Sequence, residues 1–315
     1  MKVILTGVTG NLGHEIAIDL INRGFSIIPI IQPGTISGLS RYFNEIIYSD
    51  LINSDSIQFS GTADCIIHCA GIVHFKNAGN SNEKMILKII DLARKLKIPI
   101  YSISTAFVYR PPNKNNNFNN VYEKDKWRSE QVLISSGVPH GILRPSILVG
   151  NSKTGKIQNF SGYYMVAQAF LGAMKNSIAN EGAKLRFPKL YGKTNMITVD
   201  QAAQSIGDIV GTDRLEHLFL TNPNPPTFDW LLRKTLEFFG VDKQIEYVNC
   251  SFEEFGKLKL TKTEEKLYEY GEYFNPYWST EYDFPKSICD NNLIDSDYLA
   301  RTLKYYSDHR NFNNE

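Results

Sequence analysis

A glycine-rich turn at residues 6–13 constrains the fold of this chain more than any other feature of the sequence. The turn, TGVTGNLG, follows the apolar run Val3–Thr6, and a helical pattern starts directly after it. In such a turn one glycine permits the tight bend, the next lets backbone amides approach a pyrophosphate, and the last allows close packing of helix on strand. A turn that only needs positive φ would also use glycine, but a preceding strand and a following helix favour a dinucleotide site. We therefore expect the following residues to contact a dinucleotide: Thr6, Gly7, Thr9, Gly10, Asn11, Leu12 and Gly13.

Apolar runs of strand length alternate with helical patterns through the first half of the chain. This rhythm predicts a parallel sheet covered by helices on both faces. Right-handed crossovers between such units produce an α/β, doubly wound (Rossmann) fold, whose ligands lie at the carboxyl ends of the strands. The expected strands are 3–6, 27–31, 45–48, 65–69, 98–104 and 140–144, with helices expected at 13–23 and 84–96.

The second half of the chain is more aromatic and mostly helical in pattern. Strand patterns at Met196–Val199 and His217–Leu220 indicate that the chain returns to the sheet. We therefore expect a dinucleotide-binding domain at 1–150 with a return segment at about 196–221, and a smaller substrate-binding region at 151–195 and 222–305. The polar residues 306–315 are expected to be a frayed tail, and the Pro- and Asn-rich stretch 111–120 an exposed loop.

Composition narrows the classes of function. With 34 basic and 33 acidic side chains the net charge is +1, which favours neither nucleic acid nor an anionic membrane. Four cysteines are too few and too scattered for a disulfide framework, so we expect a reducing, cytoplasmic setting. No apolar run approaches the length of a bilayer span and the chain starts directly in a strand pattern, so neither export nor membrane insertion is expected.

Two positions bear on the choice of dinucleotide. Gln32 ends the second expected strand, where an acidic residue would hold the ribose hydroxyls of NAD. Its neutral side chain leaves room for a phosphate, and Arg41 is close enough in sequence to reach one, so the sequence favours NADP, with NAD still possible. Asp50 and Leu51 follow the third expected strand, where the carboxylate would accept from the adenine amine or cap a helix.

A tyrosine, a lysine and a threonine form the candidate catalytic group. Tyr122 and Lys126 are four residues apart in a helical stretch and therefore share a face. A neighbouring ammonium favours phenolate, so we expect Lys126 to lower the pKa of Tyr122 and make it a usable acid or base. Ser104 and Thr105 end a strand, so their hydroxyls are expected at the ligand-binding edge of the sheet, where Thr105 would bond the substrate oxygen.

These motifs resemble those of the extended short-chain dehydrogenase/reductases, which carry a TGxxGxxG loop, a Ser/Thr after the fifth strand and a YxxxK helix. Within that family the chain looks most similar to the branch of thioester reductase domains and fatty acyl reductases, the male sterility-like NAD-binding branch. Three stretches carry this resemblance: Ile67–Phe75, Ser104–Tyr109 and Leu143–Gly155. The resemblance implies that Cys69, Ala70 and Gly71 line the cofactor and that Pro145 and Ser146 border the nicotinamide. Gly71 departs from the alanine usual in the family.

The resemblance also implies hydride transfer between nicotinamide and a carbonyl carbon. Tyr122 would handle the proton of the oxygen, Thr105 would polarise that oxygen, and Lys126 would hold the nicotinamide ribose. The expected substrate is a small molecule or a carrier-bound acyl group, most simply a carbonyl or acyl thioester reduced with NADPH. A homodimer is a further expectation, because exposed helices of this fold often pair.

Other functions are compatible with the same motifs. The same loop and catalytic group serve nucleotide-sugar epimerases and dehydratases, which hold NAD tightly, and a non-enzymatic NAD(P) sensor would use the loop alone.

Cysteine and histidine side chains at Cys65, His68, Cys69 and His74 would suit zinc, but the alternating faces of a strand scatter them, so no metal site is expected.

Overall fold

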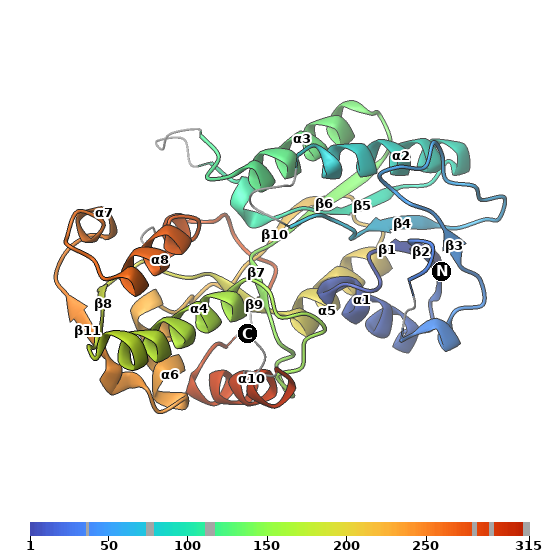
Figure 1. Cartoon of the computed structure of the whole chain (residues 1–315). Coiled ribbons are helices and arrows are strands. Elements are labelled where there is room, and N and C mark those ends of the chain that lie inside the picture. The colour runs from blue at the N-terminus through green and yellow to red at the C-terminus, as the bar shows by residue number, and fades with distance from the viewer. Residues whose placement is uncertain (36–37, 74–78, 111–116, 279–281, 290–292, 311–315) are drawn as a thin grey trace. The chain divides into compact units, whose positions relative to one another are not determined.

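The computed structural model describes residues 1–35, 38–73, 79–110, 117–278, 282–289 and 293–310. Two compact units make up the chain, and each combines stretches that are distant in sequence (Figure 1). Unit 1 consists of Met1–Leu148, Ile197–Pro223 and Phe284–Asn292, and unit 2 consists of Val149–Met196, Asn224–Asp283 and Leu293–Glu315. The sequence indicates the return near residue 196, but places Phe284–Asn292 in the substrate-binding region and not in unit 1.

A seven-stranded parallel sheet forms the centre of unit 1. Its order is β10-β6-β5-β4-β1-β2-β3, so the strand order reverses between β1 and β4. Ligands of such sheets bind beyond the carboxyl ends of the strands at this reversal. The expected doubly wound α/β fold is confirmed, with a third strand shorter than the pattern at 45–48 suggests. The strands are β1 (Lys2–Thr6), β2 (Ser26–Ile31), β3 (Ile47–Tyr48), β4 (Cys65–His68), β5 (Ile100–Ile103), β6 (His140–Pro145) and β10 (His217–Leu220).

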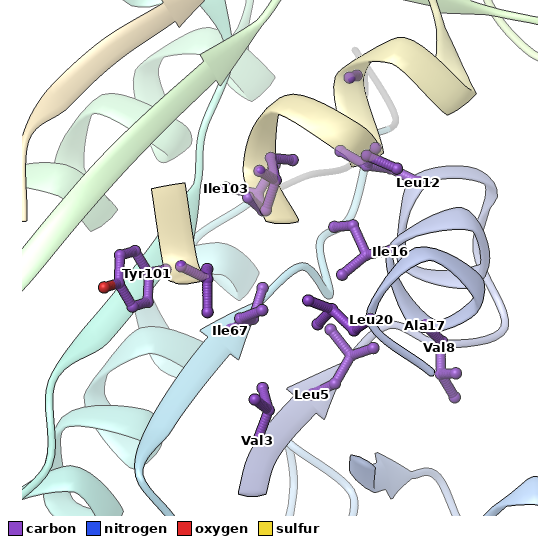
Figure 2. Close-up of a cluster of buried hydrophobic side chains, with 14 of the residues drawn as sticks. Val3, Leu5, Val8, Leu12, Ile16, Ala17, Leu20, Ile67, Tyr101 and Ile103 are labelled. Atoms are coloured by element: carbon purple, nitrogen blue, oxygen red, sulfur yellow. The ribbon is translucent and has the colours of Figure 1, made fainter. Parts of the chain in front are cut away.

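Helices cover both faces of the sheet because alternate strand residues point to opposite sides. Helices α1 (Asn11–Asn22) and α5 (Val199–Gly211) lie on one face, and α2 (Ser81–Leu96) and α3 (Val121–Ser135) lie on the other (Figure 1). Figure 2 shows side chains of the buried cluster that includes the α1 face: Val3, Leu5, Val8, Leu12, Ile16, Ala17, Leu20, Ile67, Tyr101 and Ile103. The intervening strand residues Ile4, Ile28, Ile66, Ile100 and Ile142 pack with α2 and α3.

Unit 2 is mostly helical, as its pattern indicates, but it also contains a short parallel strand pair that the sequence did not predict. The pair is formed by β8 (Leu185–Pro188) and β11 (Ile245–Val248). Buried rings of Phe170, Phe187 and Trp278 pack against one another beside it. The helices are α4 (Tyr163–Asn176), α6 (Phe228–Phe238), α7 (Phe252–Phe255), α8 (Lys262–Gly271), α9 (Asn275–Trp278) and α10 (Ser296–His309). Strands β7 (Ile147–Val149) and β9 (Met196–Thr198) form a separate short pair whose residues belong mostly to unit 1. The expectation that the strand at Met196–Val199 returns to the central sheet is therefore wrong, and only His217–Leu220 does so.

The expected tail begins later than the sequence suggests. Helix α10 continues to His309, and the ring of Tyr306 is completely buried and packs edge-on against Phe160. The expectation of fraying from residue 306 is therefore wrong for 306–309, because an apolar face of the helix is still buried there. Residues 311–315 lie outside the described part of the chain, as do His74 and residues 111–116 of the expected loop. Within the described part, no helix is both long and apolar enough to span a bilayer.

Candidate active site

The glycine turn adopts the geometry that its sequence predicts. Gly7 has a φ of 76°, and the Gly10 amide donates to its carbonyl oxygen at 2.9 Å. A Cβ on Gly13 would lie 2.1 Å from the same oxygen, and a Cβ on Gly7 would lie 2.7 Å from the Ala70 nitrogen. Close backbone contact therefore requires Gly7 and Gly13, whereas a Cβ on Gly10 would lie 3.3 Å from the Gly7 oxygen. Helix α1 starts at Asn11 behind Gly10, which has no side chain to cap the first-turn amides, so these amides and the helix dipole favour an anion.

The hydroxyl of Thr6 joins the carboxyl ends of β1 and β4. Its oxygen accepts from the amides of Cys69 and Ala70 at 3.1 and 2.9 Å. Because these two bonds use its acceptor capacity, its proton goes to Nδ1 of His68, 2.9 Å away. Burial, together with the charge of Lys126, lowers the pKa of His68 to about 3, so this ring is neutral and structural. Thr6 thus shapes the turn through backbone contacts.

The cysteines of this region behave as buried thiols. Burial raises the pKa of both Cys65 and Cys69 to about 12, which opposes the thiolate form that binds metals. Across the described residues, no three His, Cys, Asp or Glu side chains gather in a way that would hold a metal ion. His74, the fourth residue of the zinc reading, is not among them.

Thr105, Tyr122 and Lys126 come together at the carboxyl end of β5. Thr105 follows β5, is 5 % exposed, and makes a side-chain hydrogen bond with the hydroxyl of Tyr122. Nζ of Lys126, one turn further along α3, donates to the Ile103 carbonyl at 3.0 Å. The three polar groups predicted to be catalytic are therefore neighbours at the edge of the sheet where the fold binds ligands.

Burial dominates the acidity of this group. It raises the pKa of Tyr122 to about 12; the Thr105 hydrogen bond lowers this pKa in part, and the Glu123 carboxylate raises it further. The pKa of Lys126 is lowered, also by burial, with partial compensation from Cys69 and Asp125. The expectation that Lys126 lowers the pKa of Tyr122 is wrong: burial raises this pKa, and the lowering contribution comes from the Thr105 hydrogen bond and not from the ammonium.

Gly71, which departs from the family pattern, lies close to the ammonium of Lys126. A Cβ at Gly71 would lie 2.9 Å from Nζ of Lys126 and 3.1 Å from Oδ1 of Asn82. Asn82 in turn bonds both backbone groups of Ile72 at 3.1 Å. An alanine here would make the end of the flexible Lys126 side chain shift by a few tenths of an ångström.

Buried carboxylates hold helix α3 in place. Oδ2 of Asp125 accepts from the backbone amide and the side-chain amide of Asn82 at 2.9 and 2.8 Å, which ties α3 to the start of α2. Glu123, which is completely buried, pairs with Arg110 and also accepts from the Asn119 amide at 2.9 Å. Sequence reasoning did not single out these residues. The Asn82 partner of Asp125 is 43 positions away and the Arg110 partner of Glu123 is 13 positions away, and no local pattern identifies such pairs.

The residues predicted to contact the adenosine end of a dinucleotide lie in the segments beyond β2 and β3. Gln32 is exposed and starts a turn in which the Thr35 amide donates to its carbonyl at 3.0 Å. Arg41 is also exposed and donates to the Tyr42 hydroxyl at 3.0 Å. Asp50 accepts from the amides of Ile52 and Asn53, both at 2.9 Å, so its carboxylate caps a turn. The adjacent Leu51 side chain is buried in the core and not directed at a ligand.

Three buried serine hydroxyls at this edge lack a hydrogen-bond partner among the described residues. They are Ser49 after β3, Ser104 after β5 and Ser146 after β6. An unpaired buried hydroxyl costs about 1–3 kcal/mol, and a ligand bonded to these three serines at the ligand-binding edge would remove that cost. Ser104 and Ser146, beside Pro145, were predicted cofactor contacts, whereas Ser49 was missed although it directly precedes Asp50. These features fit a dinucleotide bound along the carboxyl edge of the sheet. The first-turn amides of α1 are uncapped, the glycines of the turn carry no Cβ, and the three serine hydroxyls are unpaired.

The fold and this edge define an NAD-binding α/β domain. A family model described as Male sterility protein, an NAD-binding family, matches residues 48–206. The chain belongs to this family, within the extended short-chain dehydrogenase/reductases. A search of curated proteins gave no match.

Solved structures share the fold at low sequence identity. The terminal R domain from the myxalamid PKS-NRPS biosynthetic pathway is 17 % identical over 98 % of this chain and 90 % of its own, with a TM-score of 0.73. A thiolation-reductase di-domain from an archaeal non-ribosomal peptide synthetase is 19 % identical over 98 % and 75 %, with a TM-score of 0.68. The dTDP-glucose 4,6-dehydratase of Bacillus anthracis in complex with NAD is 15 % identical over 98 % and 97 %, with a TM-score of 0.61.

Proposed function

We propose that this chain is an NADPH-dependent reductase of a carbonyl or acyl thioester. The observation that carries the proposal is the meeting of Thr105, Tyr122 and Lys126 beyond β5, at the same edge as the glycine turn. The family supports the dinucleotide, and the reductase domain among the similar structures supports the direction of the reaction.

Thr105, Tyr122 and Lys126 each have a separate role in the proposed reduction. A bound nicotinamide supplies the hydride to the carbonyl carbon. The Tyr122 hydroxyl gives its proton to the carbonyl oxygen, while the hydroxyl of Thr105, already bonded to Tyr122, orients that oxygen. Lys126 places a buried ammonium where it would hold the nicotinamide ribose. With a pKa of about 12, Tyr122 is protonated at neutral pH, which suits a proton donor.

The proposal of NADPH rests on the residues after β2 and β3. A carboxylate after β2 would repel a 2′-phosphate, and Gln32 is neutral and exposed there. The exposed guanidinium of Arg41 and the unpaired hydroxyl of Ser49 are groups that would bind such a phosphate. Loss of NADPH absorbance with acyl-coenzyme A thioesters and aldehydes tests the function, with NADH as the comparison.

The alternatives predict different outcomes of that experiment. A nucleotide-sugar epimerase or dehydratase would retain NAD through purification, which native mass spectrometry detects. A dinucleotide sensor would bind NADPH without turnover of any carbonyl and would change its oligomeric state with the ligand. The proposal requires both exchangeable NADPH and its oxidation by a carbonyl substrate, and it fails if either is missing.

Glu123→Gln should move the alkaline limit of reduction toward lower pH. The Glu123 carboxylate raises the pKa of Tyr122, and a neutral amide does not. Since reduction needs the protonated phenol, activity is present below this pKa and is lost as pH rises through it. The measurement is kcat across the neutral-to-alkaline range with saturating NADPH.

A double variant that also removes the charge of Arg110 is the control for this prediction. Removing one partner of a buried ion pair destabilises a protein by about 3–5 kcal/mol, so thermal unfolding must first show that the variant is folded. The double variant Arg110→Gln with Glu123→Gln removes both charges and should shift the limit less than Glu123→Gln alone. An unchanged or higher alkaline limit in the single variant would contradict the role given to Glu123.

A further inference from the structure

The segment from Phe284 returns to the sheet of unit 1 from a distant part of the chain. The Ile288 amide donates to the Phe219 carbonyl at 3.1 Å, and Ser287 forms a parallel bridge with Phe219 of β10. Oγ of Ser287 also accepts from the Thr221 amide at 2.9 Å. Cys289, 5 % exposed, joins the main core cluster. These contacts fix the position of the half-buried Phe284 ring at the edge of the sheet.

An aromatic cluster of Phe107, Tyr109, Phe219 and Phe284 forms there. The centroid of the Phe284 ring lies 5.5 Å from that of Phe107, 6.4 Å from that of Tyr109 and 6.2 Å from that of Phe219. The Phe219 and Tyr109 rings meet edge to face at 5.6 Å. Such clusters present apolar surface to whatever lies beside them.

Backbone contacts connect this cluster to the catalytic group. Phe107 lies in the short helical turn Ala106–Val108 that Thr105 caps, and its amide donates to the Thr105 hydroxyl at 3.4 Å. The same hydroxyl bonds Tyr122. The Phe284 ring therefore packs against Phe107, and the amide of Phe107 bonds the hydroxyl of Thr105. This hydroxyl is the one proposed to orient the substrate oxygen.

Charge around the aromatic cluster disfavours a diphosphate. The guanidinium of Arg144 lies 5.2 Å from the centre of the Phe219 ring, but it is bonded at 2.9 and 2.7 Å to Glu130. Arg110 is paired with Glu123. Both arginines nearest the cluster are thus neutralised by buried carboxylates. The exposed neighbours of Phe284, Asp283 and Lys286, carry opposite charges. An uncharged, apolar group fits this wall better than a nucleotide sugar.

We infer that Phe284 determines specificity by packing against the apolar group attached to the reacting carbonyl. This inference rests on the proposed function. It adds Phe284 as a residue that selects the substrate, and it specifies that the substrate carries an aliphatic or aromatic chain next to its carbonyl. Loss of the ring removes more apolar contact from a long chain than from a short one.

Binding of octanamide to the NADPH complex, measured by calorimetry, tests the inference without turnover, because this amide is too weak an electrophile to be reduced. Phe284→Ala should weaken octanamide binding about 10- to 100-fold, the scale of a lost apolar contact in a pocket. Phe284→Leu, which retains an apolar side chain, should recover most of the affinity. Equal affinity of wild type and Phe284→Ala would overturn the inference.

Phe25→Ala is the matched control, since Phe25 is also a half-buried ring of unit 1 but directly precedes β2, at the amino end of that strand and on the side of β1 away from β10. It should leave octanamide binding unchanged, and a loss equal to that of Phe284→Ala would count against the inference. For turnover, the preference in kcat/KM for octanal over butanal should fall in Phe284→Ala only. Octanamide binding that depends on Phe284, with no reduction of octanal or octanoyl thioester, would reject the proposed function while supporting the apolar wall.

Discussion

Tyr122→Phe should lower kcat for carbonyl reduction about 100- to 10,000-fold, the usual contribution of a positioned acid or base. The ring and its packing stay in place, and only the hydroxyl that bonds Thr105 is removed. Because the hydroxyl acts on the substrate oxygen in the transition state, NADPH affinity should remain within a few-fold of wild type. Steady-state kinetics and calorimetric titration with NADPH measure the two effects separately.

Tyr101→Phe provides the matched control. Tyr101 lies in β5, its ring is fully buried, and its hydroxyl has no partner among the described residues. Figure 2 shows this ring in the core, with its oxygen directed away from the labelled apolar side chains. The same chemical change there should leave kcat unchanged. Equal losses in both variants, or none in Tyr122→Phe, would contradict the assignment of Tyr122 as proton donor.

Gly13→Ala should weaken NADPH binding more than 10-fold and lower the free energy of unfolding by about 1–3 kcal/mol, the usual penalty for overpacking. The added Cβ would lie 2.1 Å from the Gly7 carbonyl oxygen, so helix α1 must move away from the turn. That movement takes the first-turn amides out of the position in which they would bind a pyrophosphate. NADPH titration and urea unfolding are the measurements.

A second glycine in a helix separates steric conflict from helix propensity. Gly172 in α4 is exposed, and a Cβ there would meet nothing within 4 Å. Gly172→Ala should raise the free energy of unfolding by about 0.5–1 kcal/mol, the ordinary gain of alanine over glycine in a helix. NADPH affinity should not change. A Gly13→Ala variant that bound NADPH as tightly as this control would refute the proposed role of the turn.

Local patterns predicted the parts of the fold that depend on local chemistry. The glycine turn, the parallel strands of unit 1 and the helix that carries Tyr122 and Lys126 follow from spacing and periodicity, because each needs particular residue types at fixed intervals. The return of Phe284 to β10 did not follow, since its contacts are made by backbone atoms and a serine more than 60 residues from their partners. No periodicity records such a pairing.

The candidate site could also be predicted from the sequence only in part. Thr105, Tyr122 and Lys126 could be proposed from sequence because β5 ends and α3 begins at the same edge of the sheet. The direction of the pKa shift at Tyr122 could not, because it depends on how completely the fold removes water from the phenol. The buried pairs of Glu123 with Arg110 and of Asp125 with Asn82 are likewise products of tertiary packing.

A crystal structure of the chain grown with NADP⁺ tests the central claim most directly. The account predicts a pyrophosphate against the amides that start α1 and a nicotinamide ribose within hydrogen-bonding distance of Nζ of Lys126 and the hydroxyl of Tyr122. A dinucleotide bound elsewhere, or a nicotinamide ring beyond the reach of Tyr122, would contradict it.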